Sequence, residues 1–201
     1  MARTGETIVN PRTGQTMTFR QTAGDTGGAL LQLDCTSTPH GPREPAHIHP
    51  YQESRMAVHA GALRVRIGTT ERVIGPGQEV VIPPRVPHSF WVEGDAPARY
   101  RQEFRPALRS ELFFETLFSL ARAGQLDARG MPSPLQLAVL VPAFGDEIRP
   151  TRPPWPLLRL LAALLGPLAH WRGYHAVYAQ DTESAVHRRD RARRHPTAPA
   201  G

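Results

Sequence analysis

The chain has 201 residues and a formal net charge of +6, and every one of its 24 Lys or Arg residues is arginine. Its single cysteine, Cys35, excludes an intrachain disulfide, and the first ten residues lack the apolar run of a secretory signal, so we expect a cytoplasmic protein. The 21 prolines and 17 glycines favour many short elements joined by turns over a helical bundle.

Short β-strands are predicted throughout residues 6–105. About nine or ten candidate strands follow one another at intervals of roughly ten residues, separated by turns that contain glycine or proline. Leu63, Val65 and Ile67 alternate with polar residues, and this period of two is typical of a strand with one buried face. The series as a whole predicts a β-sandwich or a β-barrel.

The periodicity becomes helical further along the chain. Apolar spacing predicts a helix over 110–123, with Ser110 as its N-cap, and a second helix over 133–144. A third run, 155–171, is apolar almost all round but contains one arginine and a Gly-Pro pair. Because this run is short for a membrane span, we expect a helix that packs on the barrel or on a partner subunit. An interfacial membrane helix is the alternative.

Most of the positive charge lies at the C-terminal end. From residue 187 onward the chain carries five arginines and one aspartate, which contribute +4 of the total of +6, so the remainder is near +2. Such a composition predicts a disordered tail over 181–201. Arginines can contact phosphates, but no reading helix or aromatic platform accompanies them, so we expect no nucleic-acid partner.

Three histidines carry the strongest functional signal. His47 and His49 stand two positions apart, which directs both imidazoles to one face of a strand, and His88 follows two further candidate strands and a turn. In this chain order a small antiparallel barrel can bring all three to one interior point. Because neutral imidazole is a very common metal ligand in proteins, the pattern predicts a site for a divalent metal.

The segment 41–92 resembles the two sequence motifs of the cupin superfamily, G-x5-H-x-H-x(3,4)-E-x6-G and G-x5-P-x-G-x2-H-x3-N. The residues that match them are Gly41, His47, His49, Gly61, Gly77, Pro83 and His88. The resemblance implies a mainly β fold, a double-stranded β-helix (jelly-roll barrel), and a homodimer. We therefore expect a barrel domain at 1–106, a helical C-terminal extension at 107–180, which the motifs do not explain, and the tail at 181–201.

The chain departs from the first motif at its carboxylate. Counting back seven positions from Gly61 reaches Ser54, whereas Glu53 stands one residue earlier. A shift of one residue on a strand turns a side chain to the opposite face, so Glu53 ligates only if a bulge or a strand end turns it inward. Glu53 is nevertheless a fourth candidate ligand. In the second motif, Arg85 and Val92 replace Gly and Asn.

The metal and the substrate stay open at this point. Two histidines with a carboxylate suit Fe(II) and O₂, whereas three histidines suit zinc and leave Fe, Mn, Ni or Zn with its full charge. Four residues near the histidines in sequence or on the same strand are candidate contacts for a small-molecule substrate: Tyr51, Gln52, Ser54 and Phe90.

Two classes of function fit the pattern. The first is a metal-dependent enzyme that acts on a small organic molecule, either an oxygenase or a non-redox isomerase or cyclase. The second is a non-catalytic module that binds a small ligand and has a degenerate metal site. A barrel of this type hosts many chemistries, so the fold does not choose between them.

Overall fold

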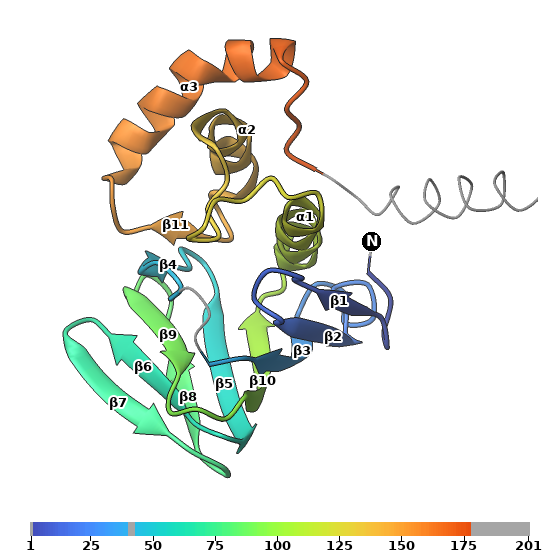
Figure 1. Ribbon diagram of the computed structural model, residues 1–201, viewed down its shortest axis with the longest axis vertical. Coiled ribbons are helices and arrows are strands. Elements are labelled where there is room, and N and C mark those ends of the chain that lie inside the picture. The colour runs from blue at the N-terminus through green and yellow to red at the C-terminus, as the bar shows by residue number, and fades with distance from the viewer. Residues whose placement is uncertain (1, 40–42, 178–201) are drawn as a thin grey trace, which may run out of the picture.

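The computed structural model describes residues 2–39 and 43–177 (Figure 1). The predicted tail, 181–201, lies outside the described residues. Within the described ranges the chain forms two antiparallel sheets and three helices, in the mainly β fold that the sequence predicts. The sheets face each other as a double-stranded β-helix, and the helices lie together at one end of it (Figure 1).

The larger sheet has the strand order β1-β2-β3-β10-β5-β8. Neighbouring strands pair antiparallel, and β10 in the middle pairs with both β3 and β5. The strands of this sheet are β1 (Thr7–Val9), β2 (Thr16–Gln21), β3 (Leu31–Ser37), β5 (Glu53–Ala60), β8 (Glu79–Ile82) and β10 (Ala98–Arg105).

The smaller sheet has the order β11-β4-β9-β6-β7. Its strands are β4 (His47–Ile48), β6 (Leu63–Ile67), β7 (Thr70–Ile74), β9 (His88–Val92) and β11 (Arg149–Pro150). The last of these comes from the C-terminal extension and begins 44 positions after the end of β10, the final strand of the barrel. A two-residue strand carries no periodic signal, and the sequence gives no prediction of β11.

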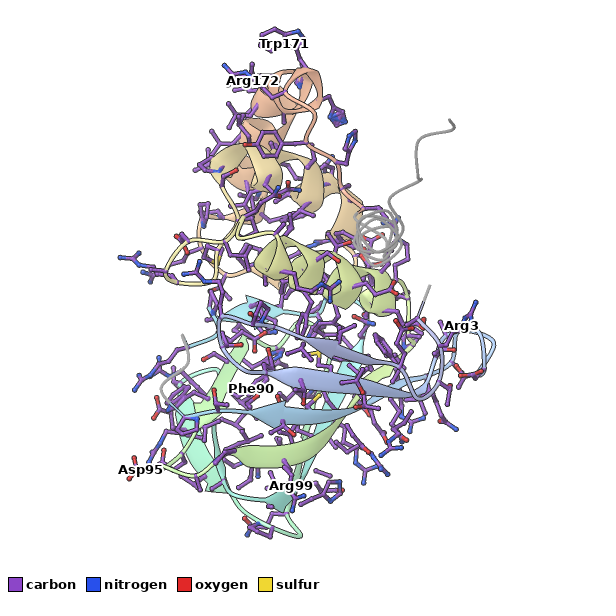
Figure 2. All side chains as sticks on the ribbon, turned by 45° about the vertical axis from the view of Figure 1, so that its right-hand side comes forward. Arg3, Phe90, Asp95, Arg99, Trp171 and Arg172 are labelled. Carbon is purple, nitrogen blue, oxygen red and sulfur yellow. The ribbon has the colours of Figure 1, made fainter. Side chains whose placement is uncertain are left out.

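The core lies between the two sheets and is built from alternating side chains. In β3 every second residue is buried, and the same alternation runs through β5. The buried cluster includes Phe19, Leu33, Met56 and Tyr100. Phe90, labelled in Figure 2, lies between the sheets and belongs to the same cluster.

Gly61 closes the turn between β5 and β6 and admits no larger residue. Its φ is +70°, and an added Cβ would lie 2.5 Å from the carbonyl oxygen of Pro97. The left-handed backbone and the close approach both require glycine at this position. The motif glycine therefore has a steric role in the barrel.

The helices α1 (Ser110–Arg122), α2 (Pro134–Phe144) and α3 (Trp155–Trp171) agree with the predicted ranges to within one residue. The predicted cap of the first helix is wrong, because the N-cap position is Arg109 and Ser110 is the first helical residue. The Ser110 hydroxyl instead accepts a hydrogen bond of 2.8 Å from the Gln52 amide. This bond fixes the start of α1 against the strand that follows the paired histidines.

The three helices pack in chain order outward from the barrel (Figure 1). Phe114 and Phe118 of α1 belong to the buried cluster of the barrel. Helix α2 packs on α1 through Phe144, and α3 packs on α2 through Ala169, which is fully buried. The extension is thus continuous with the barrel core through α1, while α3 lies farthest from it.

One face of α3 is apolar and uncovered. The exposed fraction reaches 67% for Leu164 and 77% for Trp171, the residue at the outer tip in Figure 2. Among the described residues, no helix has both the length and the apolar character needed to cross a membrane.

Candidate metal centre

The histidine cluster consists of His47, His49 and His88, and all three side chains are buried. Their exposed fractions are 5%, 7% and 3%. His47 on β4 and His88 on β9 are directly paired across the sheet, and His49 follows β4 immediately. The ring centroids lie 4.4 to 5.1 Å apart, so the structure brings together the three residues that the sequence singles out.

Each imidazole of the cluster is held by a backbone carbonyl at its Nδ1 atom. His47 Nδ1 lies 2.9 Å from the carbonyl oxygen of Pro45, and His88 Nδ1 lies 2.9 Å from that of Val86. His49 Nδ1 lies 2.7 Å from the carbonyl oxygen of Glu147. Because a carbonyl oxygen only accepts, Nδ1 must carry the proton in every ring. The lone pair of each neutral imidazole is therefore on Nε2.

The three rings together form a donor set that fits a divalent metal. One ring nitrogen from each histidine lies within 4.8 Å of those of the other two. Three neutral nitrogen donors on one side of a point match the protein ligands of catalytic zinc sites and leave at least one position for another ligand. Carbonyl bonds at the opposite ring nitrogen are the usual way in which metal-binding histidines are oriented.

Burial keeps the cluster neutral. Burial lowers the pKa of His49 to about 3, and the neighbouring His47 lowers it further in the same direction. Burial likewise lowers the pKa of His88 to about 4 and lowers the pKa of His47. At neutral pH all three rings are unprotonated, so a metal ion displaces no proton from them.

The C-terminal extension takes part directly in the site. The Glu147 carbonyl that orients His49 lies in the segment between α2 and β11, 98 residues away in the chain. The Glu147 carboxylate accepts a hydrogen bond of 3.1 Å from the backbone N–H of Arg109, ahead of α1. Beside it, β11 pairs with β4, with Pro150 opposite His47. The extension therefore contacts both His47 and His49, through strand pairing and through a hydrogen bond, respectively.

Aromatic side chains wall the cluster on the barrel side. The Phe104 ring meets the His49 ring edge to face, with centroids 5.1 Å apart. Phe90, a predicted substrate contact, is 9% exposed and packs edge to face on Tyr100 with centroids 5.8 Å apart. Phe90 thus belongs to the barrel core that surrounds the cluster.

Glu53 does not lie with the histidines. It pairs in register with Arg105 at the first position of β5, without a bulge there, and side chains alternate along the strand from this point. Among the described residues, the group of converging ligand atoms contains the three histidines and not Glu53. Because side chains alternate along a strand, the one-residue offset from the motif puts Glu53 on the opposite face of β5 from Ser54.

Ser54 occupies the interior position that the motif reserves for a carboxylate. It is 1% exposed, and its cross-strand partners are Phe104 and Ile82, which are buried on the same face. Its hydroxyl oxygen has no hydrogen-bond partner among the described residues. A short hydroxyl thus stands on the interior face of β5, opposite Phe104, whose ring packs on His49.

The other two predicted substrate contacts, Tyr51 and Gln52, differ in burial. Tyr51 is 50% exposed, and the guanidinium of Arg149 lies 5.9 Å from its ring centre. Gln52 is fully buried, and its amide nitrogen lies 2.8 to 2.9 Å from the oxygens of Pro106, Ala107 and Ser110. Gln52 therefore ties the histidine-bearing segment to α1.

Glu44, which the sequence pattern does not single out, has one enclosed carboxylate oxygen. Its Oε2 atom is enclosed and has no hydrogen-bond partner among the described residues, although the residue as a whole is partly exposed. Burial raises the pKa of Glu44 to about 7, and His88 lowers it in part. The available signal was its place three residues before His47 in the run REPAHIH.

The segment that carries the three histidines matches a known protein family. Residues 34–101 match the family described as the cupin domain. Residues 34–101 of this chain are a cupin domain. The comparison with curated proteins finds no match.

Three solved structures illustrate the similarity. KdgF from a Halomonas species is 19% identical and covers 49% of this chain and 84% of its own, with a TM-score of 0.43. An RmlC-like cupin from Shewanella frigidimarina is 16% identical over 52% and 86%, with a TM-score of 0.44. The DMSP lyase DddQ from Ruegeria pomeroyi is 28% identical over 40% of each chain, with a TM-score of 0.36. The family assignment rests on the domain match.

We predict that the metal-free protein loses stability as the pH falls from about 6.5 towards 4. The unfolded histidines have a pKa near 6.5, whereas His49 and His88 have pKa values of about 3 and about 4 in the folded state. The unfolded state therefore takes up protons first, so the stability from neutral burial is complete above pH 6.5 and declines below it.

Urea unfolding at pH 7.5 and pH 4.5 measures this loss. We expect His49→Gln to lose less stability over the interval than the wild-type protein, by about 2 kcal/mol. His59→Gln, on the exposed side of β5, is the control and should behave as the wild type. Equal losses in His49→Gln and the wild type would contradict the proposed burial of neutral imidazoles.

Proposed function

We propose that this protein is a metal-dependent enzyme that acts on a small organic molecule in the cytoplasm. His47, His49 and His88 hold a divalent ion of Fe, Mn, Ni or Zn. The observation that carries the proposal is that one ring nitrogen of each histidine lies within 4.8 Å of the other two, while a backbone carbonyl holds each ring at Nδ1 and leaves the lone pair on Nε2. Fixing three tautomers toward one point is what metal ligation requires and what core packing does not.

Different residues of the chain have different roles in such a site. The three imidazoles supply neutral donors and leave the ion with its full positive charge and an open position. When bound, the ion supplies Lewis-acid activation of a substrate oxygen, or a position for O₂ in an oxygenase. Phe104 packs on His49 and keeps this side of the cluster apolar. We favour the non-redox chemistry of an isomerase or cyclase, because a two-histidine, one-carboxylate set does not form with Glu53.

The second candidate is a non-catalytic cupin module that binds a small ligand. The observation in its favour is the replacement of the motif carboxylate by Ser54, which leaves the ligand set one group short of the family pattern. The two candidates differ in whether the purified protein holds a metal ion, and this difference is measurable.

Metal analysis of the purified protein tests the proposal. We expect the wild type to bind a single divalent ion per chain, and His88→Ala to bind it about 100-fold more weakly or not at all, because one of three donors is lost. His59→Ala is the matched control, since His59 is exposed on the outer side of β5. Turnover without oxygen separates the non-redox enzyme from the oxygenase. A wild type that binds no metal even after incubation with each ion in turn supports the second candidate.

We further propose that the protein forms a homodimer through α3. The buried side of α3 packs on α2 through Ala162, Leu165 and Ala169. A second stripe on the helix stays exposed, and its members follow one another at spacings of four, three, four and three: Leu157, Leu161, Leu164, Leu168 and Trp171. Apolar residues at this heptad spacing form a narrow stripe along which a second helix can pack. A helix that lies on a membrane does not need this spacing.

Light scattering coupled to size-exclusion chromatography tests this interface. We expect the wild type to elute as a dimer and Leu164→Glu to elute as a monomer, because a buried carboxylate at the seam has no partner. Val73→Glu introduces the same charge at another exposed apolar residue, on β7, and it should leave the dimer intact. A monomeric wild type, or a dimeric Leu164→Glu variant, contradicts the proposal.

A further inference from the structure

The short segment before β4 directs an acid into the protein. Arg43 is exposed, and its guanidinium lies 4.6 Å from the ring centre of Trp91 on β9. The next residue, Glu44, has its Oε2 atom enclosed, and Pro45 then supplies the carbonyl that orients His47. Two contacts therefore hold the segment: Arg43 packs over Trp91, and the carbonyl of Pro45 accepts a hydrogen bond from His47. Glu44 lies between Arg43 and Pro45 in the chain.

The carboxyl group of Glu44 lies within electrostatic range of the histidine cluster. It interacts with His88, raising the pKa of that ring, although burial dominates and leaves the net change downward. It also interacts with Cys35 and Tyr100, whose side chains are buried between the sheets. Within the described part of the chain, no arginine shifts the pKa of Glu44, and its Oε2 atom has no hydrogen-bond donor.

An enclosed carboxylate oxygen without a hydrogen-bond donor or a cation is unfavourable, and proteins usually provide such a partner. Burial raises the pKa of Glu44, which reflects the cost of placing charge on an enclosed oxygen that has no donor among the described residues. A divalent cation held by His88 and its two neighbours is the partner that this arrangement lacks. The three histidines bring no negative charge, and Ser54 brings none from β5.

We infer that Glu44 supplies the carboxylate that balances the charge of the metal ion, from the loop before β4 instead of from the motif position on β5. The inference rests on the metal site proposed above and adds a residue to it. Glu44 is not one of the groups whose atoms converge within 4.8 Å. It therefore acts on the ion as a neighbouring charge at the His88 side of the cluster.

A carboxylate on the loop before β4 is held less rigidly than a carboxylate on β5 would be. An acid at position 54 would lie in a strand, beside Phe104 and Ile82, and would be fixed by the sheet. Glu44 lies on a loop, so its carboxyl group can adjust to the ion or to a ligand on it. Neutralisation of part of the metal charge also moderates the Lewis acidity that three neutral imidazoles leave in place.

Metal affinity in two isosteric variants tests the inference. Glu44→Gln and Glu53→Gln each remove one negative charge: the first from the loop before β4, where Oε2 is enclosed, and the second from the face of β5 opposite Ser54. The dissociation constants for Zn²⁺ and Co²⁺ are measured by competition with a chromophoric chelator at pH 7.5. We expect Glu44→Gln to bind each ion about 10-fold more weakly than the wild type, and Glu53→Gln to match the wild type.

A second readout separates loss of charge from loss of fold. Urea unfolding of the metal-free proteins should show Glu44→Gln at least as stable as the wild type, because the substitution removes an unpartnered buried acid. The rise in melting temperature on addition of Zn²⁺ should be smaller for Glu44→Gln than for Glu53→Gln.

The outcomes are distinguishable. If Glu44→Gln binds Zn²⁺ and Co²⁺ within threefold of the wild type, the inference about Glu44 is overturned and the histidine site stands. If the wild type binds neither ion more tightly than His88→Ala does, the proposed function itself fails. A loss of threefold or more confined to Glu44→Gln supports the inference.

Discussion

Three hydrogen bonds from imidazole Nδ1 atoms to backbone carbonyls determine what this cupin domain can do. Each bond fixes a ring in one orientation and one tautomer, so that the three Nε2 lone pairs point to a common place. Two of the carbonyls, those of Pro45 and Val86, stand two residues before the histidine that they orient. The third comes from Glu147, beyond α2, which makes the extension a structural part of the centre.

The parts of this account that depend on short-range patterns were predictable from the sequence. Two-residue alternation identifies strands such as β6, and apolar spacing locates all three helices closely. The histidine spacing predicts the cluster because strand geometry and chain order suffice to bring His47, His49 and His88 together. Strand alternation left Glu53 open as a ligand, because a one-residue offset reverses a side chain unless a bulge intervenes, and the sequence does not show whether a bulge is present.

The parts that depend on long-range contacts were not predictable. Strand β11 has two residues and owes its existence to pairing with β4, and the Glu147 carbonyl reaches His49 across 98 positions. No local pattern encodes either. Glu44 lies close to His47 in sequence, but a glutamate in a loop is ordinarily solvated, and only the fold shows that its carboxyl group turns inward. Ser110 has the side chain of an N-cap, yet Gln52 engages it one residue inside the helix.

The most direct test of the central claim is the tautomeric state of the three histidines, measured by two-dimensional ¹⁵N–¹H NMR on metal-free protein with labelled histidine. We predict that His47, His49 and His88 are neutral at pH 7 with the proton on Nδ1. Addition of Zn²⁺ should then shift the Nε2 resonances of these three rings together. Protons on Nε2, or Nε2 resonances that Zn²⁺ leaves unchanged, would contradict the account.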